Sequence, residues 1–228
     1  MLFRRTLVLF SAVLLVAAVA SAASPDLSGS IRLRLEEWNW FDTPAANDHY
    51  LFGASTIHLA ANWKLPKSQW TIEVTQPTLA GLPEDSIAAP PAGQLGLGAT
   101  YYAANHHTTA AGLFVSQAFA RFDHLAGIDN SLQLGRFTMI EGVEGPSPNP
   151  ILGAVRKARI AHRLIGNFGF SHVGRSFDGA RYTQRDGDLS WNLFAGRPTA
   201  GVFIVNGMPE RLGARPSLVL SSLQLCDW

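Results

Sequence analysis

The chain has 228 residues, one cysteine, and 18 Lys and Arg against 17 Asp and Glu, a formal net charge of +1. A charge so close to zero excludes the basic surface of a nucleic-acid-binding protein, and one cysteine excludes a disulfide framework within the chain. The sequence also contains no phosphate loop and no dinucleotide fingerprint, and it predicts no catalytic residues, no metal site and no cofactor.

Residues 1–23 have the organisation of a cleaved signal peptide. The segment begins with Arg4 and Arg5, continues as an uncharged apolar run, and ends on the small residues Ala20-Ser21-Ala22. The apolar run is shorter than the ~20 residues that a membrane-spanning helix needs. We therefore expect export, with cleavage after Ala22 or Ala23. Without Arg4 and Arg5 the chain has 16 basic and 17 acidic residues, a formal charge of −1.

The start of the mature chain predicts antiparallel strands. In residues 29–42, 56–65 and 70–75, aliphatic or aromatic residues alternate with polar ones, which is the period of a β-strand with two different faces. Pro66-Lys67 separates the second segment from the third. Two alternating segments of ~10 residues joined by a short turn are typical of a membrane β-hairpin.

Aromatic residues favour a transmembrane β-barrel over the alternative, a secreted β-sandwich that acts as a binding or adhesion module. Five of them lie near predicted strand ends, where barrels carry aromatic girdles: Trp38, Trp40, Phe41, Trp63 and Trp70. A sandwich has the same alternation with its apolar face buried. A barrel leaves Ile57, Leu59, Trp63 and Leu65 on the outside, whereas a sandwich buries them.

The rest of the chain predicts further strands and two long loops. Residues 77–112, rich in Pro, Gly, Ala and Thr, are expected to form an extracellular loop or a loop folded into the pore. The other expected elements are strands at 113–123, 131–137, 175–184 and 188–196, an Asp-Gly turn at 185–187, a loop at 141–153, a short basic helix or irregular loop at 155–164, and a strand beginning in 201–206. Residues 208–228 do not continue the alternation. The chain thus divides into a signal peptide (1–23), a β-barrel portion with seven or eight strands (24–207) and an atypical tail (208–228).

Three motifs resemble the alginate export family of outer-membrane porins. They are Leu134-Gly135-Arg136-Phe137, the run Gly174–Arg181 with the sequence GRSFDGAR, and Arg32-Leu33-Arg34-Leu35-Glu36. The resemblance implies an all-β, antiparallel barrel in the bacterial outer membrane, in contact with lipid, with an arginine-lined lumen for an anionic polysaccharide. The sequence departs from the family in its small number of strands. Trp228 is a terminal aromatic of the kind that barrel-assembly machinery recognises, but the adjacent Cys226 and Asp227 are atypical of a final strand.

The candidate binding residues are arginines expected on the lumen face. Guanidinium groups in such positions form a ladder of weak sites for an anionic polysaccharide or small anions. The alternative is that these arginines pair with Glu36, Glu37, Asp123, Asp178 and Asp188, and Asp178 in particular is expected to hold one of them. The candidates are Arg32, Arg34, Arg121, Arg136, Arg175, Arg181 and Arg197, of which Arg136, Arg175 and Arg181 lie in the family-like motifs.

Overall fold

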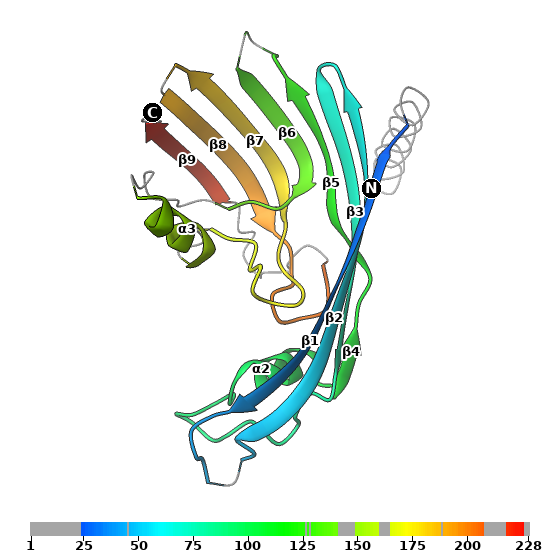
Figure 1. The fold of residues 1–228 in the computed structure, drawn as a ribbon, viewed down its shortest axis with the longest axis vertical. Coiled ribbons are helices and arrows are strands. Elements are labelled where there is room, and N and C mark those ends of the chain that lie inside the picture. The colour runs from blue at the N-terminus through cyan, green and yellow to red at the C-terminus, as the bar shows by residue number, and fades with distance from the viewer. Residues whose placement is uncertain are drawn as a thin grey trace, which may run out of the picture.

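The computed structural model describes residues 24–44, 46–125, 127, 129–140, 149–159, 165–187, 189–207 and 218–225, so the predicted signal peptide lies outside it (Figure 1). The strands are β1 (Asp26–Asn39), β2 (His49–Leu65), β3 (Ser68–Ala80), β4 (Thr109–Ala111), β5 (Phe114–Asp123), β6 (Asn130–Phe137), β7 (Phe177–Asp186), β8 (Leu189–Pro198) and β9 (Leu218–Leu225). The helices are α2 (Leu97–Asn105) and α3 (Pro150–Arg159).

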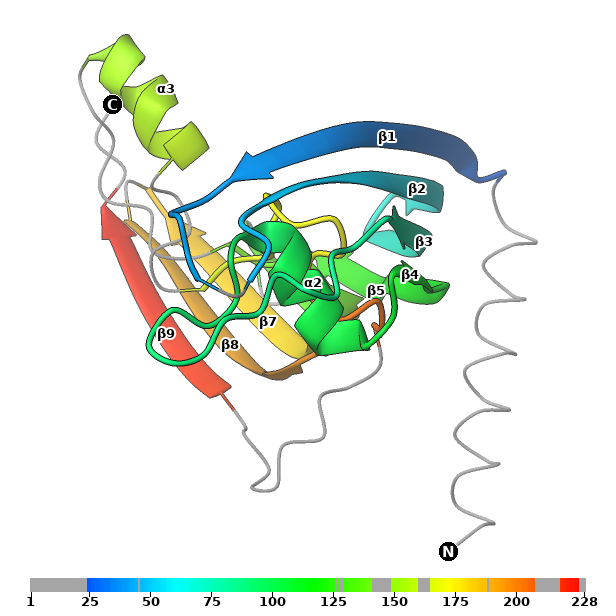
Figure 2. The same cartoon turned by 90° about the horizontal axis from the view of Figure 1, so that it is seen from below.

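All nine strands of the described residues belong to one antiparallel sheet, which confirms the all-β prediction. The sheet order is β1-β2-β3-β5-β6-β7-β8-β9, and β4 adds to β3. Because every strand shares this sheet, the described residues do not form the two facing sheets of a sandwich. The sheet is strongly curved, with β1 and β9 at its two edges (Figures 1 and 2). Closure of this curved sheet into a barrel stays a prediction.

The predicted hairpins are present. In the first, Leu65 pairs with Ser68, which leaves Pro66-Lys67 as a two-residue turn between β2 and β3. In the second, Asp186 pairs with Leu189 across the turn that contains Gly187, whose φ of +55° favours glycine. The alternation of the sequence therefore sets both the strands and their register.

The convex face of the sheet is apolar and exposed. On β1, Leu27, Leu33 and Leu35 are each more than 70% exposed, and Ile31 is 64% exposed. On β2, Leu59 is 61% exposed, while Ile57 and Leu65 are half-buried. Trp63 differs, because it is buried. Apart from Trp63, the apolar side chains on this face of β1 and β2 are exposed or half-buried, so this face does not cover a core within the described residues.

The concave face is filled by segments that the sequence pattern did not predict to be ordered. The expected loop at 77–112 contains α2 and β4, and α2 lies beside the lower ends of β1 and β2 (Figure 1). The core of this region includes Phe52, Leu79 and Tyr101, with Val173 from the segment 165–176. Tyr101 is fully buried and its ring centroid lies 6.3 Å from that of Phe52. Packing against the sheet therefore gives this helix its stability.

A second core lies under β6, β7 and β8. Phe137, Met139, Phe177 and Phe194 form it. Gly196 makes room for one of these rings, because a Cβ there would lie 2.6 Å from the Phe194 ring. Small residues under an aromatic ring let a strongly curved sheet keep its concave side packed.

Two sequence predictions are corrected, and one open alternative is decided. Residues 201–206 form turns rather than the start of a strand, because their main-chain groups bond within the segment, to Gly174 and to Asn105. The tail continues the sheet, since β9 pairs with β8 over its whole length. Of the two structures considered for 155–164, the helix is present over its described part, as α3, and it begins at Pro150. No helix in the described part of the chain is long and apolar enough to cross a membrane.

Candidate functional site on the concave face

The seven candidate arginines do not share one location. Five of them, Arg32, Arg34, Arg121, Arg175 and Arg181, contact the concave face or the segments on it. Arg197 does not. Arg197 is exposed, and it lies an even number of residues after Trp191 and Leu193 of β8, which are exposed on the convex face. Residues two apart on a strand share a face, so the prediction that Arg197 lines the lumen is wrong.

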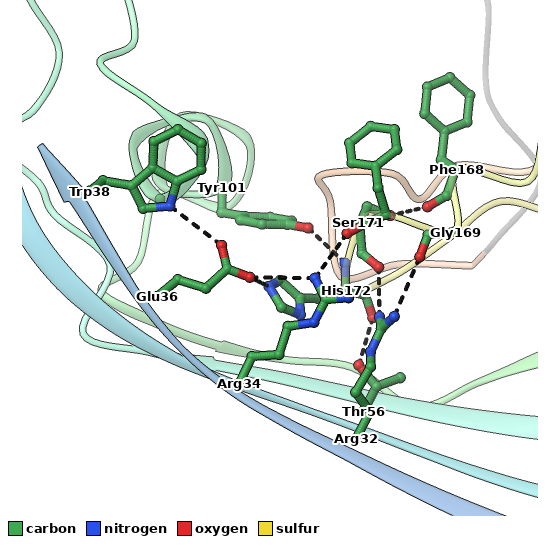
Figure 3. A network of polar contacts seen from close by, with 12 residues as sticks. Arg32, Arg34, Glu36, Trp38, Thr56, Tyr101, Phe168, Gly169, Ser171 and His172 are labelled. Carbon is green, nitrogen blue, oxygen red and sulfur yellow. Dashed lines mark hydrogen bonds and ion pairs between the residues drawn. The ribbon is translucent and has the colours of Figure 1, made fainter. Parts of the chain in front are cut away.

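Arg32 and Arg34 hold the inner segment, residues 165–176, against β1. Arg32 donates to the carbonyls of Ser171 at 2.7 Å and Gly169 at 3.3 Å, and Arg34 donates to the carbonyl of Phe170 at 3.2 Å. Figure 3 shows both guanidinium groups reaching from β1 to this loop. These two arginines therefore bind main-chain oxygens and fix the inner segment.

Glu36 and His172 form the buried centre of the same contact. His172 Nε2 lies 2.9 Å from Glu36 Oε1, and Trp38 Nε1 donates to the other carboxylate oxygen at 3.3 Å (Figure 3). The His172 main chain is also held, because its N–H donates to Tyr101 Oη at 2.8 Å and its carbonyl accepts from Thr56 at 2.9 Å. Burial raises the pKa of Tyr101 to about 12, so its hydroxyl stays protonated.

Acid is expected to loosen the inner segment. Burial lowers the pKa of His172 below its usual value; Arg34 and Arg32 lower it further, and Glu36 partly offsets them. The folded state thus binds a proton less readily than the unfolded state, and stability falls as the pH drops below about 6.5. Hydrogen exchange of amides 169–174, corrected for intrinsic rates, should be faster at pH 5 than at pH 7.5. His172→Gln should remove this difference, and a difference that persists in the variant would assign the effect to another group.

Arg136 is a structural residue. Its Nε and Nη2 donate to the two oxygens of Asp178 at 2.6 and 2.9 Å, and its Nη1 donates to the carbonyls of Val115 and Gly207 at 2.9 and 2.8 Å. Asp178 does bind one of the predicted arginines. With these bonds Arg136 links β5, β6, β7 and the turn at 207. For Arg136 the structure therefore agrees with the alternative that the arginines pair with acidic residues of the chain.

A polar cavity of about 460 Å³ lies on the concave face near the short turns. Arg121, Arg181 and Arg185 line it. Arg121 donates to Asp123 at 2.9 Å and Arg181 donates to Asn192 at 3.2 Å. Arg185 was not among the predicted residues, although it lies four residues after Arg181 on β7, and an even spacing along a strand places both side chains on the same face.

A smaller cavity of about 200 Å³ lies between β2, β3, β5 and the inner segment. Glu73, His58 and Arg175 contribute its charged or titratable groups. Arg175 places its guanidinium carbon 5.3 Å from the centre of the Phe168 ring, a cation–π distance. The concave face thus carries a larger cavity with three arginines and two aspartates, and a smaller one that combines Glu73 with His58 and Arg175.

The described residues contain no group of three or more His, Cys, Asp or Glu side chains placed to hold a metal ion. No protein-family model, no curated protein and no solved structure matches the chain. The sheet and its two cavities are therefore the features of the chain that bear on its function.

Proposed function

We propose that this chain forms part of the wall of an outer-membrane β-barrel channel that passes small anionic solutes or an anionic polysaccharide. The observation that carries the proposal is the asymmetry of the sheet: exposed leucines and isoleucine cover the convex face, and arginines lie on the concave face. A protein in water would bury that apolar surface, whereas lipid matches it.

The contents of the concave face favour a wide barrel. An eight-stranded barrel has an interior just large enough for its own side chains. Here the concave face carries α2, the inner segment and the turns near residues 199–207 in addition to side chains. We therefore propose that β1 and β9 pair with further strands in the membrane, which other copies of the chain supply when it is refolded alone, and that the inner segment narrows the resulting lumen.

The polar cavity is the proposed anion site of this channel. Arg121, Arg181 and Arg185 present guanidinium groups there beside Asp123 and Asp129. Carboxylates that neutralise part of the charge weaken anion binding, and weak binding suits a conducting channel, since solutes must leave as well as enter. Arg32 and Arg34, which hold the inner segment, are proposed to act on the width of the pathway instead.

Reversal potentials test the anion preference. We expect the refolded chain in planar bilayers to prefer anions, and the triple substitution of Arg121, Arg181 and Arg185 by Gln to remove most of that preference, because three of the charges that attract anions are lost. Arg197→Gln, on the convex face, is the matched control and should leave selectivity unchanged. Absence of conductance together with solubility without detergent would contradict the channel proposal, and an unchanged preference in the triple variant would contradict the site.

A further inference from the structure

The smaller cavity contains a carboxylate whose surroundings are set by a β-bulge. The register of β3 with β5 shifts between Glu73 and Val74, which leaves Ser116 as the extra residue beside Gln117. Both side chains then reach the same carboxylate: Ser116 Oγ donates to Glu73 Oε1 at 2.6 Å and Gln117 Nε2 donates to Oε2 at 3.2 Å. Bulges commonly redirect a side chain at a functional site.

The hydrogen-bond directions in this cluster follow from the carboxylate. An ionised carboxylate only accepts, so the Ser116 hydroxyl must donate its proton to Glu73. The Thr75 hydroxyl, 2.7 Å from Ser116 Oγ, must then donate to Ser116, and it accepts from the next group. That group is His58 Nδ1, 2.9 Å from Thr75 Oγ1. His58 therefore carries its proton on Nδ1.

Because His58 carries its proton on Nδ1, its other ring nitrogen, Nε2, is an open hydrogen-bond acceptor. A neutral imidazole protonated on Nδ1 has a lone pair on Nε2, and His58, whose side chain is 37% exposed, lines the cavity. A second acceptor belongs to a residue that lines the same cavity: Asn167 Oδ1 is buried and has no hydrogen-bond partner among the described residues. The cavity thus combines two unfilled acceptors with the negative charge of Glu73.

We propose that this cavity binds a small polyhydroxylated solute, neutral or carrying an ammonium group, through His58 Nε2, Asn167 Oδ1 and Glu73. Hydroxyl and ammonium groups donate the hydrogen bonds that these acceptors need, and leaving a buried acceptor unfilled is costly. The volume of about 200 Å³ admits one sugar ring or a smaller polyol. The site is separate from the arginine-lined polar cavity and does not require the protein to conduct.

Three probes of one ring size test the chemistry. D-glucosamine and D-glucuronate each differ from D-glucose at one position: glucosamine has an ammonium group at C2 and glucuronate a carboxylate at C6. We expect glucose and glucosamine to shift the imidazole resonances of His58 in NMR titrations of the refolded chain in a detergent without a sugar head group. Glucuronate should bind about tenfold more weakly, the equivalent of one unfavourable charged contact. Tighter binding of glucuronate would show that Arg175 dominates the cavity and would overturn the proposal.

A matched pair of variants tests the hydrogen-bond chain. Glu73→Gln can donate to Ser116 as well as accept from it, which allows the chain to reverse and His58 to carry its proton on Nε2. Binding of glucose should then fall about tenfold, the cost of roughly one lost hydrogen bond. Glu37→Gln is the control, because Glu37 also contacts a histidine, His49 at 2.9 Å, but both lie exposed and away from the cavity. Equal losses in both variants would overturn the proposal.

The tautomer of His58 in the unaltered protein provides a measurement that does not depend on the folding of a variant. The nitrogen resonances of His58 should report a proton on Nδ1 and a free lone pair on Nε2. A proton on Nε2 in the absence of solute would contradict the hydrogen-bond order, and with it the proposed site.

Discussion

Leu59→Arg is expected to lower the free energy of unfolding in a lipid bilayer by about 2–4 kcal/mol, the cost of an arginine near the middle of a membrane barrel wall. Leu59 lies on the convex face near the middle of β2, is 61% exposed, and pairs with Gly29 and Val74 on its two sides. Urea titration of the protein in vesicles, followed by tryptophan fluorescence, measures the change.

The environment of the convex face decides the sign and size of this effect. If the face met water, an arginine at so exposed a position would change stability by no more than about 0.5 kcal/mol. Leu59→Phe keeps the position apolar and serves as the control, with little expected loss. A negligible effect of Leu59→Arg in vesicles would therefore contradict the membrane proposal directly, whether or not the sheet closes.

Hairpins could be predicted from the sequence because local alternation determines them. The turn at Pro66-Lys67 and the one at Gly187 follow from a period of two on either side of a turn residue. The same period also predicts the face on which Arg197 lies. Arg197 is separated by an even number of residues from Trp191 and Leu193, which the alternation places on the outer face. The incorrect lumen assignment arose from grouping arginines by type rather than by face.

Helix α2 and the inner segment could not be predicted, because distant contacts hold them. The sequence around α2 is rich in Gly and Ala, and its N-terminal N–H groups at Gly98 and Ala99 are satisfied by Tyr50 Oη, at 3.0 and 3.3 Å, from β2. The inner segment has no periodicity, and Arg32 and Arg34 reach it from more than 130 residues away. Propensity and pattern carry no signal for such contacts.

The bulge at Ser116 was hidden for a related reason. A bulge depends on the register of two strands, β3 and β5, which are separated by α2 and β4. Neither sequence alone shows which residue becomes the extra one. The cluster around Glu73 was therefore absent from the predicted sites, although each of its residues lies in a segment that was correctly expected to be a strand.

Arg136→Leu is expected to destabilise the fold by about 2–3 kcal/mol while leaving anion selectivity unchanged. The substitution leaves the Asp178 carboxylate without its bidentate partner and removes the donor to the carbonyls of Val115 and Gly207. The Arg136 side chain is 16% exposed and that of Asp178 is 34% exposed, so water compensates only part of the loss. Urea titration and reversal potentials on the same preparation measure the two effects.

A double variant separates the ion pair from simple loss of packing. Arg136→Leu combined with Asp178→Leu removes both charges, so the double variant should be more stable than the sum of the single losses predicts, with a coupling energy of about 1 kcal/mol or more. Additive losses would show that the pair contributes little. A shift of the reversal potential in Arg136→Leu as large as in the triple variant of the polar cavity would return Arg136 to the permeation pathway. The contrast between the two measurements distinguishes arginines that build the wall from arginines that face the solute.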